Sequence, residues 1–391
     1  MFPADAPAAD RAAPGAPPEE RPDLMVVGLG PAGASAAAAA ASAGCRVLAV
    51  DRRRRIGEPV QCAEFVSSAF SIEDFSWEGI ATQRIVRMVT AVQAERPRVS
   101  EDFRGRMICR SAFDQALARR AAAAGAHIRL GVAVCEVRAD GGVRLSSGEF
   151  IRPRALVGAD GPRSRVGAAI GQSNRQLVAA RQFTVGLRQP YEATDIFLSS
   201  AYPGGYAWLF PKGSAANLGV GVDFHRRDRL KSLLRDLHAR LAAEARVQAA
   251  PPSSTTGGLI PVGGRLRAIG ALGAVSALLA GDAAGLTHPV TGAGIEAAVY
   301  SGVLAGRAVA SWLAGHGNAL QEYENDLSDL YDPAYARALG RRRELRRGFG
   351  RGVSAAEALW RGWIASPEYW ADAAGPSPEV AARPPRNPLM A

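Results

Sequence analysis

The chain is nearly free of lysine, and this absence shapes its charge. Lys212 and Lys231 are the only lysines among 47 Lys and Arg residues, so arginine carries the net charge of +10. A basic balance favours anionic partners, such as a diphosphate, acidic lipid headgroups or an acidic protein, although the same arginines also fit a plain solvated surface. The sequence has no recognised nucleic-acid module and no stripe of alternating aromatic and basic residues, so we expect no nucleic-acid partner.

Cysteine is also scarce, and long hydrophobic runs are missing. The four cysteines show no CxxC pairing, which predicts a reduced, cytoplasmic setting. Because no run of about 18 uncharged apolar residues is present, we expect no membrane span and at most peripheral membrane contact. The N-terminus has acidic residues and no apolar core, which argues against a secretory signal. We also expect no metal site.

What the chain does contain is glycine, placed at two distant turns. The first turn follows an apolar strand, opens an Ala-rich helix expected over 32–43, and is followed by a strand expected over 46–50. This unit has the glycine spacing and length of a dinucleotide-binding fingerprint. It brings a diphosphate close to a helix N-terminus, and the acid after the second strand accepts both ribose hydroxyls. The residues predicted to bind the nucleotide are Gly28, Gly30, Pro31, Ala32, Gly33, Asp51 and Arg52.

The second turn lies near the far end of the chain, where a strand ends in Gly281-Asp282 and two more glycines precede a helix. The two turns together predict one long ligand, held at its diphosphate and again at its redox ring, and we expect FAD. NAD(P) fits less well. Asp51 would repel the 2′-phosphate that the arginine run 52–55 could bind, and a nicotinamide enzyme has no use for the second turn. We expect the run to form a solvated loop or a docking patch for an anionic substrate or partner.

The order of these motifs resembles the FAD-dependent superfamily that contains aromatic hydroxylases, tryptophan halogenases and geranylgeranyl reductases. The resemblance covers residues 24–325. It implies that Asp282 binds the ribityl chain, that Asp160 belongs to the middle motif, and that Arg110 contacts FAD ahead of a helix. It also implies a second helix N-terminus facing the N1–O2 edge of the flavin, where reduced flavin carries negative charge. The residues assigned to this end are Gly281, Asp282, Pro289, Gly292, Ala293, Gly294 and Ile295.

Within the superfamily the chain is most similar to geranylgeranyl reductases. Their PxxYxWxFP motif, which lines a prenyl tunnel, matches residues 203–211 at every fixed position, although the same alternation fits an ordinary strand core. An aromatic tunnel suits a long apolar or a bulky aromatic substrate. Their cysteine loop resembles residues 59–64 and implies Cys62 as a proton donor. His288 is a second candidate donor because its position in the turn would bring it against the flavin ring. The residues predicted to act on the substrate are Cys62, His288, Tyr206 and Trp208.

The leading prediction is an FAD-dependent oxidoreductase that reduces C=C bonds of a prenyl or similar hydrophobic substrate by hydride transfer from reduced flavin. The alternative is a class A-type monooxygenase that hydroxylates an aromatic substrate, free or borne on a peptide or protein. A non-catalytic flavin-binding maturation factor is a third interpretation. A halogenase is excluded because the chain has no WxWxIP motif and no lysine before Lys212. No second GxGxxG follows a strand, so electrons would come from transiently docked NAD(P)H or from an acidic donor protein.

The expected fold is α/β. It combines a Rossmann-type, GR2-like FAD-binding lobe with an antiparallel-sheet substrate lobe and C-terminal helices. Long alternating strands in the middle of the chain predict the second sheet. The predicted divisions are a disordered tail over 1–22, a discontinuous FAD-binding domain over 23–171 and 276–325, a substrate-binding domain over 172–275, and a C-terminal helical segment and tail over 326–391.

Overall fold

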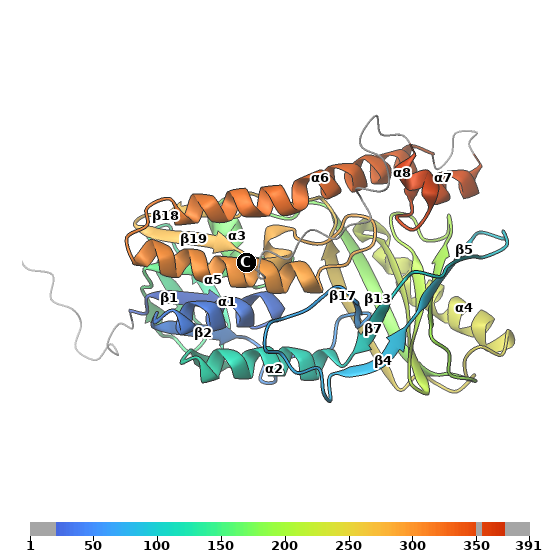
Figure 1. The fold of residues 1–391 in the computed structure, drawn as a ribbon, viewed down its shortest axis with the longest axis horizontal. Coiled ribbons are helices and arrows are strands. Elements are labelled where there is room, and N and C mark those ends of the chain that lie inside the picture. Colours follow the sequence, from blue (N-terminus) through green and yellow to red (C-terminus); the bar gives the residue numbers. More distant parts are fainter. Residues whose placement is uncertain (1–20, 349–353, 372–391) are drawn as a thin grey trace, which may run out of the picture.

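The computed structural model describes residues 21–348 and 354–371. Two lobes lie side by side, each built on a large sheet, and the predicted α/β class is confirmed (Figure 1). Almost all of the predicted tail over 1–22, and the last part of the C-terminal segment, lie outside the described residues. Within the described ranges, no helix has both the length and the apolar content that a membrane crossing needs.

The first lobe contains a six-stranded sheet in the order β18-β19-β12-β1-β2-β8. Neighbours from β19 to β8 pair in parallel, whereas β18 is antiparallel to β19. The central strands are buried apolar runs, as expected for a parallel sheet that is covered on both faces. Because β1 and β2 are parallel, their C-terminal ends bring Gly28 and Asp51 to the same edge. The strands are β1 (Leu24–Val27), β2 (Val47–Asp51), β8 (His127–Leu130), β12 (Ala155–Gly158), β18 (Ile269–Leu272) and β19 (Val275–Leu279).

Helices α1 (Pro31–Ser42) and α5 (Ile295–Leu313) pack against each other in this lobe (Figure 1). Their contact is at main-chain distance, since a Cβ on Gly302 would lie 2.2 Å from the carbonyl oxygen of Ala32. A Cβ on Gly306, one turn later, would lie 2.4 Å from the carbonyl oxygen of Ala36. The helices therefore run parallel, and the N-terminus of α5 lies roughly 9 Å beyond that of α1 along their common direction.

The second lobe contains a seven-stranded sheet in the order β17-β13-β16-β15-β14-β5-β6. Its strands pair antiparallel except at β14 and β5, which are parallel, so the sheet is mixed at one edge. Helix α4 (Leu230–Ala243) packs its leucines on β13 and β16. The strands are β5 (Arg87–Val92), β6 (Arg98–Ser100), β13 (Leu177–Gly186), β14 (Ala193–Leu198), β15 (Ala207–Lys212), β16 (Ala215–Asp223) and β17 (Ser254–Pro261).

The lobes exchange segments, so the predicted domain limits do not coincide with breaks in the fold. Strands β5 and β6 come from outside 172–275 and complete the second sheet, whereas β18, from inside that range, joins the first. Helix α6 (Ala319–Gly348) runs through the predicted limit at 325 and extends along both lobes (Figure 1). Its continuation, α7 (Ala355–Gly362) and α8 (Pro367–Trp370), covers the second sheet near β5. The domain division therefore stays a prediction.

Shorter elements connect the lobes and complete their surfaces. A small sheet in the order β3-β7-β4 lies at the junction, and another in the order β11-β10-β9 lies beside the first lobe. These elements are β3 (Phe65–Ser67), β4 (Ala81–Ile85), β7 (Gly105–Ile108), β9 (Val134–Val137), β10 (Val143–Leu145), β11 (Phe150–Ile151), α2 (Arg110–Ala123), α3 (Arg165–Ala169), η1 (Phe224–Arg229) and η2 (Gly281–Ala284).

Candidate flavin and substrate site

A cavity of about 1250 Å³ lies between the lobes and is lined by residues from both of them. Pockets for one small ligand usually measure about 300–1,000 Å³, so this cavity has room for a cofactor and a substrate. All predicted site residues except Gly33, Gly281 and Pro289 line it. Those that do are Gly28, Gly30, Pro31, Ala32, Asp51, Arg52, Cys62, Arg110, Asp160, Tyr206, Trp208, Asp282, His288, Gly292, Ala293, Gly294 and Ile295.

The nucleotide end of the cavity is shaped by main chain. Gly28 has φ +94°, and a Cβ there would lie 2.4 Å from the carbonyl oxygen of Ala159, so only glycine fits. Gly30 is the N-cap of α1 and makes no side-chain cap, which leaves the N–H groups of the first turn available to an anion. A Cβ on Gly30 would meet nothing within 4 Å, because the space beside it is the open cavity. This cradle fits a diphosphate.

Asp51 is already oriented for a ribose. Its Oδ2 accepts from the backbone N–H of Leu29 at 2.8 Å, and its Oδ1 accepts from that of Arg53 at 2.7 Å. Each carboxylate oxygen has a second lone pair, so the two ribose hydroxyls can still donate to it. Arg52 follows Asp51 at the rim of the cavity and is exposed.

The three predicted residues that do not line the cavity support those that do. A Cβ on Gly33 would lie 1.8 Å from the carbonyl oxygen of Gly28, so Gly33 lets α1 pack on the glycine turn. Gly281 has φ +60° and donates its N–H to Ser301 Oγ at 2.9 Å, which fixes the turn before Asp282. Pro289 is buried, and its carbonyl oxygen accepts from Arg342 at 3.3 Å.

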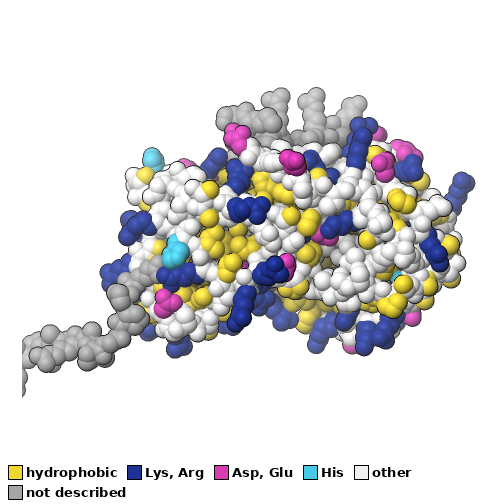
Figure 2. All heavy atoms as spheres, turned by 90° about the horizontal axis from the view of Figure 1, so that it is seen from below, with side chains coloured by type: hydrophobic (Ala, Val, Ile, Leu, Met, Phe, Trp, Pro, Cys, Tyr) yellow, Lys and Arg dark blue, Asp and Glu magenta, His cyan; other side chains and the backbone are white. Residues whose placement is uncertain are grey.

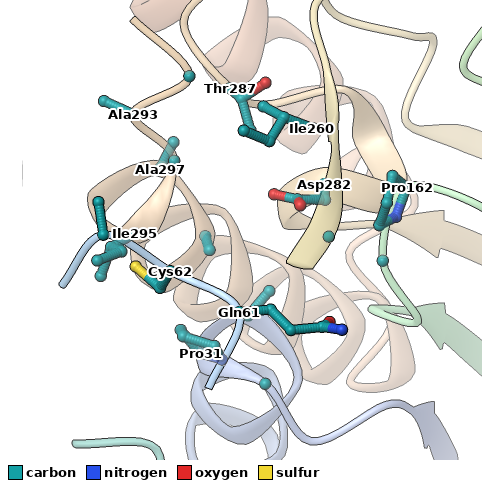
Figure 3. Close-up of a pocket in the computed structure, with 18 of the residues that line it drawn as sticks. Pro31, Gln61, Cys62, Pro162, Ile260, Asp282, Thr287, Ala293, Ile295 and Ala297 are labelled. Atoms are coloured by element: carbon teal, nitrogen blue, oxygen red, sulfur yellow. The ribbon is translucent and has the colours of Figure 1, made fainter. Parts of the chain in front are cut away.

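Asp282 is a carboxyl group that can accept hydrogen bonds from a ligand in the cavity. It lies on η2 and lines the cavity, and Figure 3 shows its carboxylate facing the open space. Burial raises its pKa to about 6, and Arg110 offsets only part of that effect. Hydroxyl donors from a ribityl chain would stabilise the ionised form, so the group suits the role implied by the resemblance.

The turn before α5 provides a second helix N-terminus. Gly294 is the N-cap of α5 without a side-chain cap, so the first N–H groups of α5 are available where the flavin ring is expected. His288 braces this turn, because its Nδ1 accepts from the backbone N–H groups of Val290 at 3.4 Å and Thr291 at 3.3 Å. Burial lowers the pKa of His288 to about 4, so the ring is neutral at pH 7. Its predicted role as a proton donor stays a prediction.

Asp160 and Arg110 are held by their own neighbours. The Asp160 carboxylate accepts from the hydroxyl of Ser164 and from the backbone N–H of Arg165, at 2.7 Å for the latter. Asp160 therefore shapes the loop at the nucleotide end. Arg110, at the start of α2, makes a two-point ion pair with Asp114, with both contacts at 3.0 Å.

Cys62 lies in the wall of the cavity, near the turn before α5 where the flavin ring is expected. Figure 3 shows its sulfur beside Ile295, with Asp282 across the open space. Sγ accepts from the backbone N–H of Glu64 at 3.1 Å. Burial raises the pKa of the Cys62 thiol and Arg110 lowers it only in part, so the thiol keeps its proton at neutral pH.

The cysteine loop is held by a buried polar network that the sequence did not reveal. Glu64, with φ +67°, accepts from Lys212 Nζ at 2.7 Å and from Asn217 Nδ2 at 2.9 Å. Its other oxygen accepts from the backbone N–H of Arg110 at 2.9 Å. Gln182 donates to the carbonyl oxygen of Cys62 at 3.1 Å. The one available signal was Lys212 itself, a lysine in a chain that otherwise uses arginine.

The aromatic end of the cavity comes from the start of β15, with the residue before it, and from the C-cap of α7. Tyr206 donates its hydroxyl to the carbonyl oxygen of Thr291 at 2.7 Å, which ties the second lobe to the flavin-side turn. Trp208 donates Nε1 to Gln182 Oε1 at 3.1 Å. Trp363, which sequence reasoning missed, lines the cavity beside them. This end is apolar and aromatic, as a hydrophobic substrate requires.

Comparison with known proteins agrees with this geometry. A family model described as "FAD binding domain" matches residues 21–331. A digeranylgeranylglycerophospholipid reductase from Methanopyrus kandleri is 35% identical over 311 residues, which is 74% of this chain and 76% of that protein. One from Methanothrix thermoacetophila is 36% identical over 316 residues, 74% of this chain and 78% of that protein. The chain therefore belongs to the FAD-binding domain family and, within it, to the group of geranylgeranyl-type reductases.

Solved structures share the fold. A geranylgeranyl bacteriochlorophyll reductase-like protein from Thermoplasma acidophilum has a TM-score of 0.75 and 24% identity, covering 88% of this chain and 96% of its own. A probable FAD-dependent monooxygenase from Pseudomonas aeruginosa has a TM-score of 0.63 and 20% identity, covering 84% and 97%. With the family match, the fold and a cavity that fits FAD, the protein is an FAD-dependent oxidoreductase.

Proposed function

We propose that the protein reduces carbon–carbon double bonds of an isoprenoid chain with bound FAD. The observation that carries the proposal is a protonated, half-buried thiol in the wall of the cavity, near the turn where the flavin ring is expected, while the other end of the cavity is aromatic. An isolated alkene needs a positioned acid, whereas hydroxylation of an aromatic ring does not need one at this point. The reductase names of the relatives support the same chemistry.

In this proposal, bound FAD supplies a hydride when reduced, and the chain supplies the proton and the positioning. Tyr206, Trp208 and the apolar lining hold the chain and exclude water. Cys62 donates the proton from Sγ to the second alkene carbon. The resulting thiolate faces Arg110, whose charge favours it, and then takes a proton from solvent. Glu64 and Gln182 keep the Cys62 loop in place and act as positioning residues.

The test uses dithionite-reduced holoenzyme and geranylgeranyl diphosphate under argon. We expect formation of a reduced prenyl chain, and loss of at least about 100-fold in turnover for Cys62→Ala, since removal of a general acid typically costs about 10²–10⁴-fold. Cys109→Ala is the matched control, because Cys109 is partly buried but does not line the cavity. Undiminished turnover in Cys62→Ala would remove the thiol from the mechanism. Hydroxylation of an aromatic substrate in air, with no prenyl reduction, would favour the monooxygenase instead.

The remaining partners are proposals of the same kind. A hydrophobic substrate follows from the lining, and the reductant is NAD(P)H or an acidic donor protein. Figure 2 shows a face on which Lys and Arg side chains are spread among hydrophobic patches and outnumber the acidic ones, which suits an acidic donor. The four free cysteines support a reducing, cytoplasmic location.

A further inference from the structure

A second, small cavity lies directly behind the aromatic end of the main one. It measures about 40 Å³, and its lining is mainly apolar, with Leu198, Leu345 and Leu359, and also includes Arg342 and Arg346. Several residues line both cavities, so the partition between them is a single layer of side chains. The shared residues are Gly204, Gly205, Tyr206, Val290, Arg342 and Trp363.

Tyr206 and Trp363 supply the bulk of this partition. Their rings meet edge to face with centroids 5.2 Å apart. Tyr206 is fixed by its hydrogen bond to Thr291, and Trp363 is only 3% exposed. Among the described residues the Trp363 Nε1 has no hydrogen-bond partner, so the indole is placed by packing alone. A large ring held only by packing can be removed without breaking a polar contact.

Helix α7 holds Trp363 in this position. A Cβ on Gly362 would lie 2.2 Å from the side chain of Leu345, so α7 is docked closely on α6. Trp360, three residues before Trp363, donates Nε1 to Glu95 at 2.7 Å, and the Arg98 guanidinium lies 3.8 Å from the centre of its ring. Trp360 lines neither cavity. Trp360 therefore fixes the helix from its outer side, and Trp363, the C-cap residue directly after the helix, closes the cavity.

We propose that Trp363 ends the substrate arm of the cavity and sets the longest prenyl chain that the enzyme accepts. This inference rests on the proposed function and deepens it. The family match ends at residue 331, so the limit is set by a residue beyond the matched region, at the C-terminal end of α7. Beyond the indole there is mainly apolar space that a longer chain would fill once the ring is gone.

The experiment compares Trp363→Ala with Trp360→Ala, a matched variant at similar burial in helix α7, which ends directly before Trp363. Dithionite-reduced holoenzyme is given farnesyl, geranylgeranyl and geranylfarnesyl diphosphate, which differ by one isoprene unit, and kcat/KM is measured for each. In Trp363→Ala we expect the ratio of the longest chain to the middle one to rise at least about 10-fold, because even one methylene changes selectivity by that much. Trp363→Phe should restore most of the wild-type ratio. Trp360→Ala should lower the Tm and leave the ratio unchanged.

An unchanged ratio in Trp363→Ala, or an equal shift in Trp360→Ala, overturns the inference. Failure of the proposed function is recognised separately, since wild-type enzyme would then reduce none of the three chains. In that case equilibrium binding of the same diphosphates, followed through the flavin absorbance, tests whether Trp363 limits the chain length. If the dependence of Kd on chain length changes in Trp363→Ala and not in Trp360→Ala, the inference is supported. If it does not change in Trp363→Ala, the inference is contradicted.

Discussion

Gly28, Gly30 and Gly33 shape the nucleotide half of the cavity with main chain alone, whereas Glu64, Gln182 and Lys212 shape the substrate half with side chains. In the first half the three glycines belong to one short turn, which packs against the main chain of Ala159. In the second they come from β13, β15 and the loop before β3. At Gly28 and Gly33 the nucleotide half therefore has no room for a side chain, while the substrate half depends on the completeness of buried polar contacts. Substitutions should expose this difference.

The largest effect is expected from Gly33→Ala. The new Cβ would collide with the carbonyl oxygen of Gly28, so we expect a loss of about 3 kcal/mol or more in the free energy of unfolding, together with loss of FAD. Gly30→Ala is the control, since its Cβ meets no protein atom and stability should stay within about 0.5 kcal/mol. That variant should still bind FAD more weakly, because the methyl group enters the cavity. Urea unfolding and FAD fluorescence titration measure both. Equal destabilisation by the two variants would contradict a main-chain origin.

In the substrate half, Lys212→Met should cost about 2 kcal/mol of stability. The substitution leaves the Glu64 carboxylate without its cation. Breaking a fully buried ion pair costs roughly 3–5 kcal/mol, and we expect less here because the Lys212 side chain is 24% exposed. Turnover should fall as the Cys62 loop loosens. The double variant Glu64→Gln/Lys212→Met should recover part of the loss. Lys231→Met, at the other lysine, is exposed and should have no effect. If both single lysine variants behave alike in urea unfolding, the network does not support the loop.

Asp282→Asn should separate stability from cofactor binding. The pKa of Asp282 in the folded protein, about 6, lies above its ordinary value of 3.8, so its contribution to stability is full below about pH 4 and is lost as pH rises through 6. The variant should therefore make FAD-free protein more stable at pH 7 by about 1–2 kcal/mol, and this gain should vanish near pH 4. FAD affinity should fall by about 10-fold or more, since hydrogen bonds to a charged acceptor are lost. A less stable FAD-free variant at pH 7 would show that the carboxylate already has donors.

The smallest effect at pH 7 is expected from His288→Asn, at less than about 1 kcal/mol, because the amide oxygen can replace Nδ1 as the acceptor for the turn. Burial holds the pKa of His288 at about 4, below its ordinary value of 6.5. Protonation of His288 should therefore lower the stability of the wild type as pH falls from 6.5 to 4. The variant lacks this group and should not show this loss. An inflection near pH 6.5 in kcat that disappears in the variant would instead identify His288 as the proton donor.

The two halves also differ in how far the sequence predicts them. Both glycine-rich turns are local patterns whose spacing dictates backbone geometry, so the Rossmann-type lobe and its cofactor edge could be inferred before the structure was known. Glu64 and Asn217 are far apart in sequence and no periodicity links them, so their contact appears only in the fold. The same holds for the parallel pairing of β14 with β5 and for Trp363 beside Tyr206. Tertiary packing, which no short pattern encodes, decides these features.

The close contact of α1 with α5 has a consequence for the protein before FAD binds. With Gly302 and Gly306 pressed on the main chain of the neighbouring helix, the two amide-rich helix ends cannot drift apart. The distance between the N-termini of α1 and α5 is therefore fixed during folding. Binding of the dinucleotide does not have to order these two helices, so its entropic cost is lower. A site with this fixed spacing selects a ligand of one length, because a shorter dinucleotide can contact only one of the two helix N-termini.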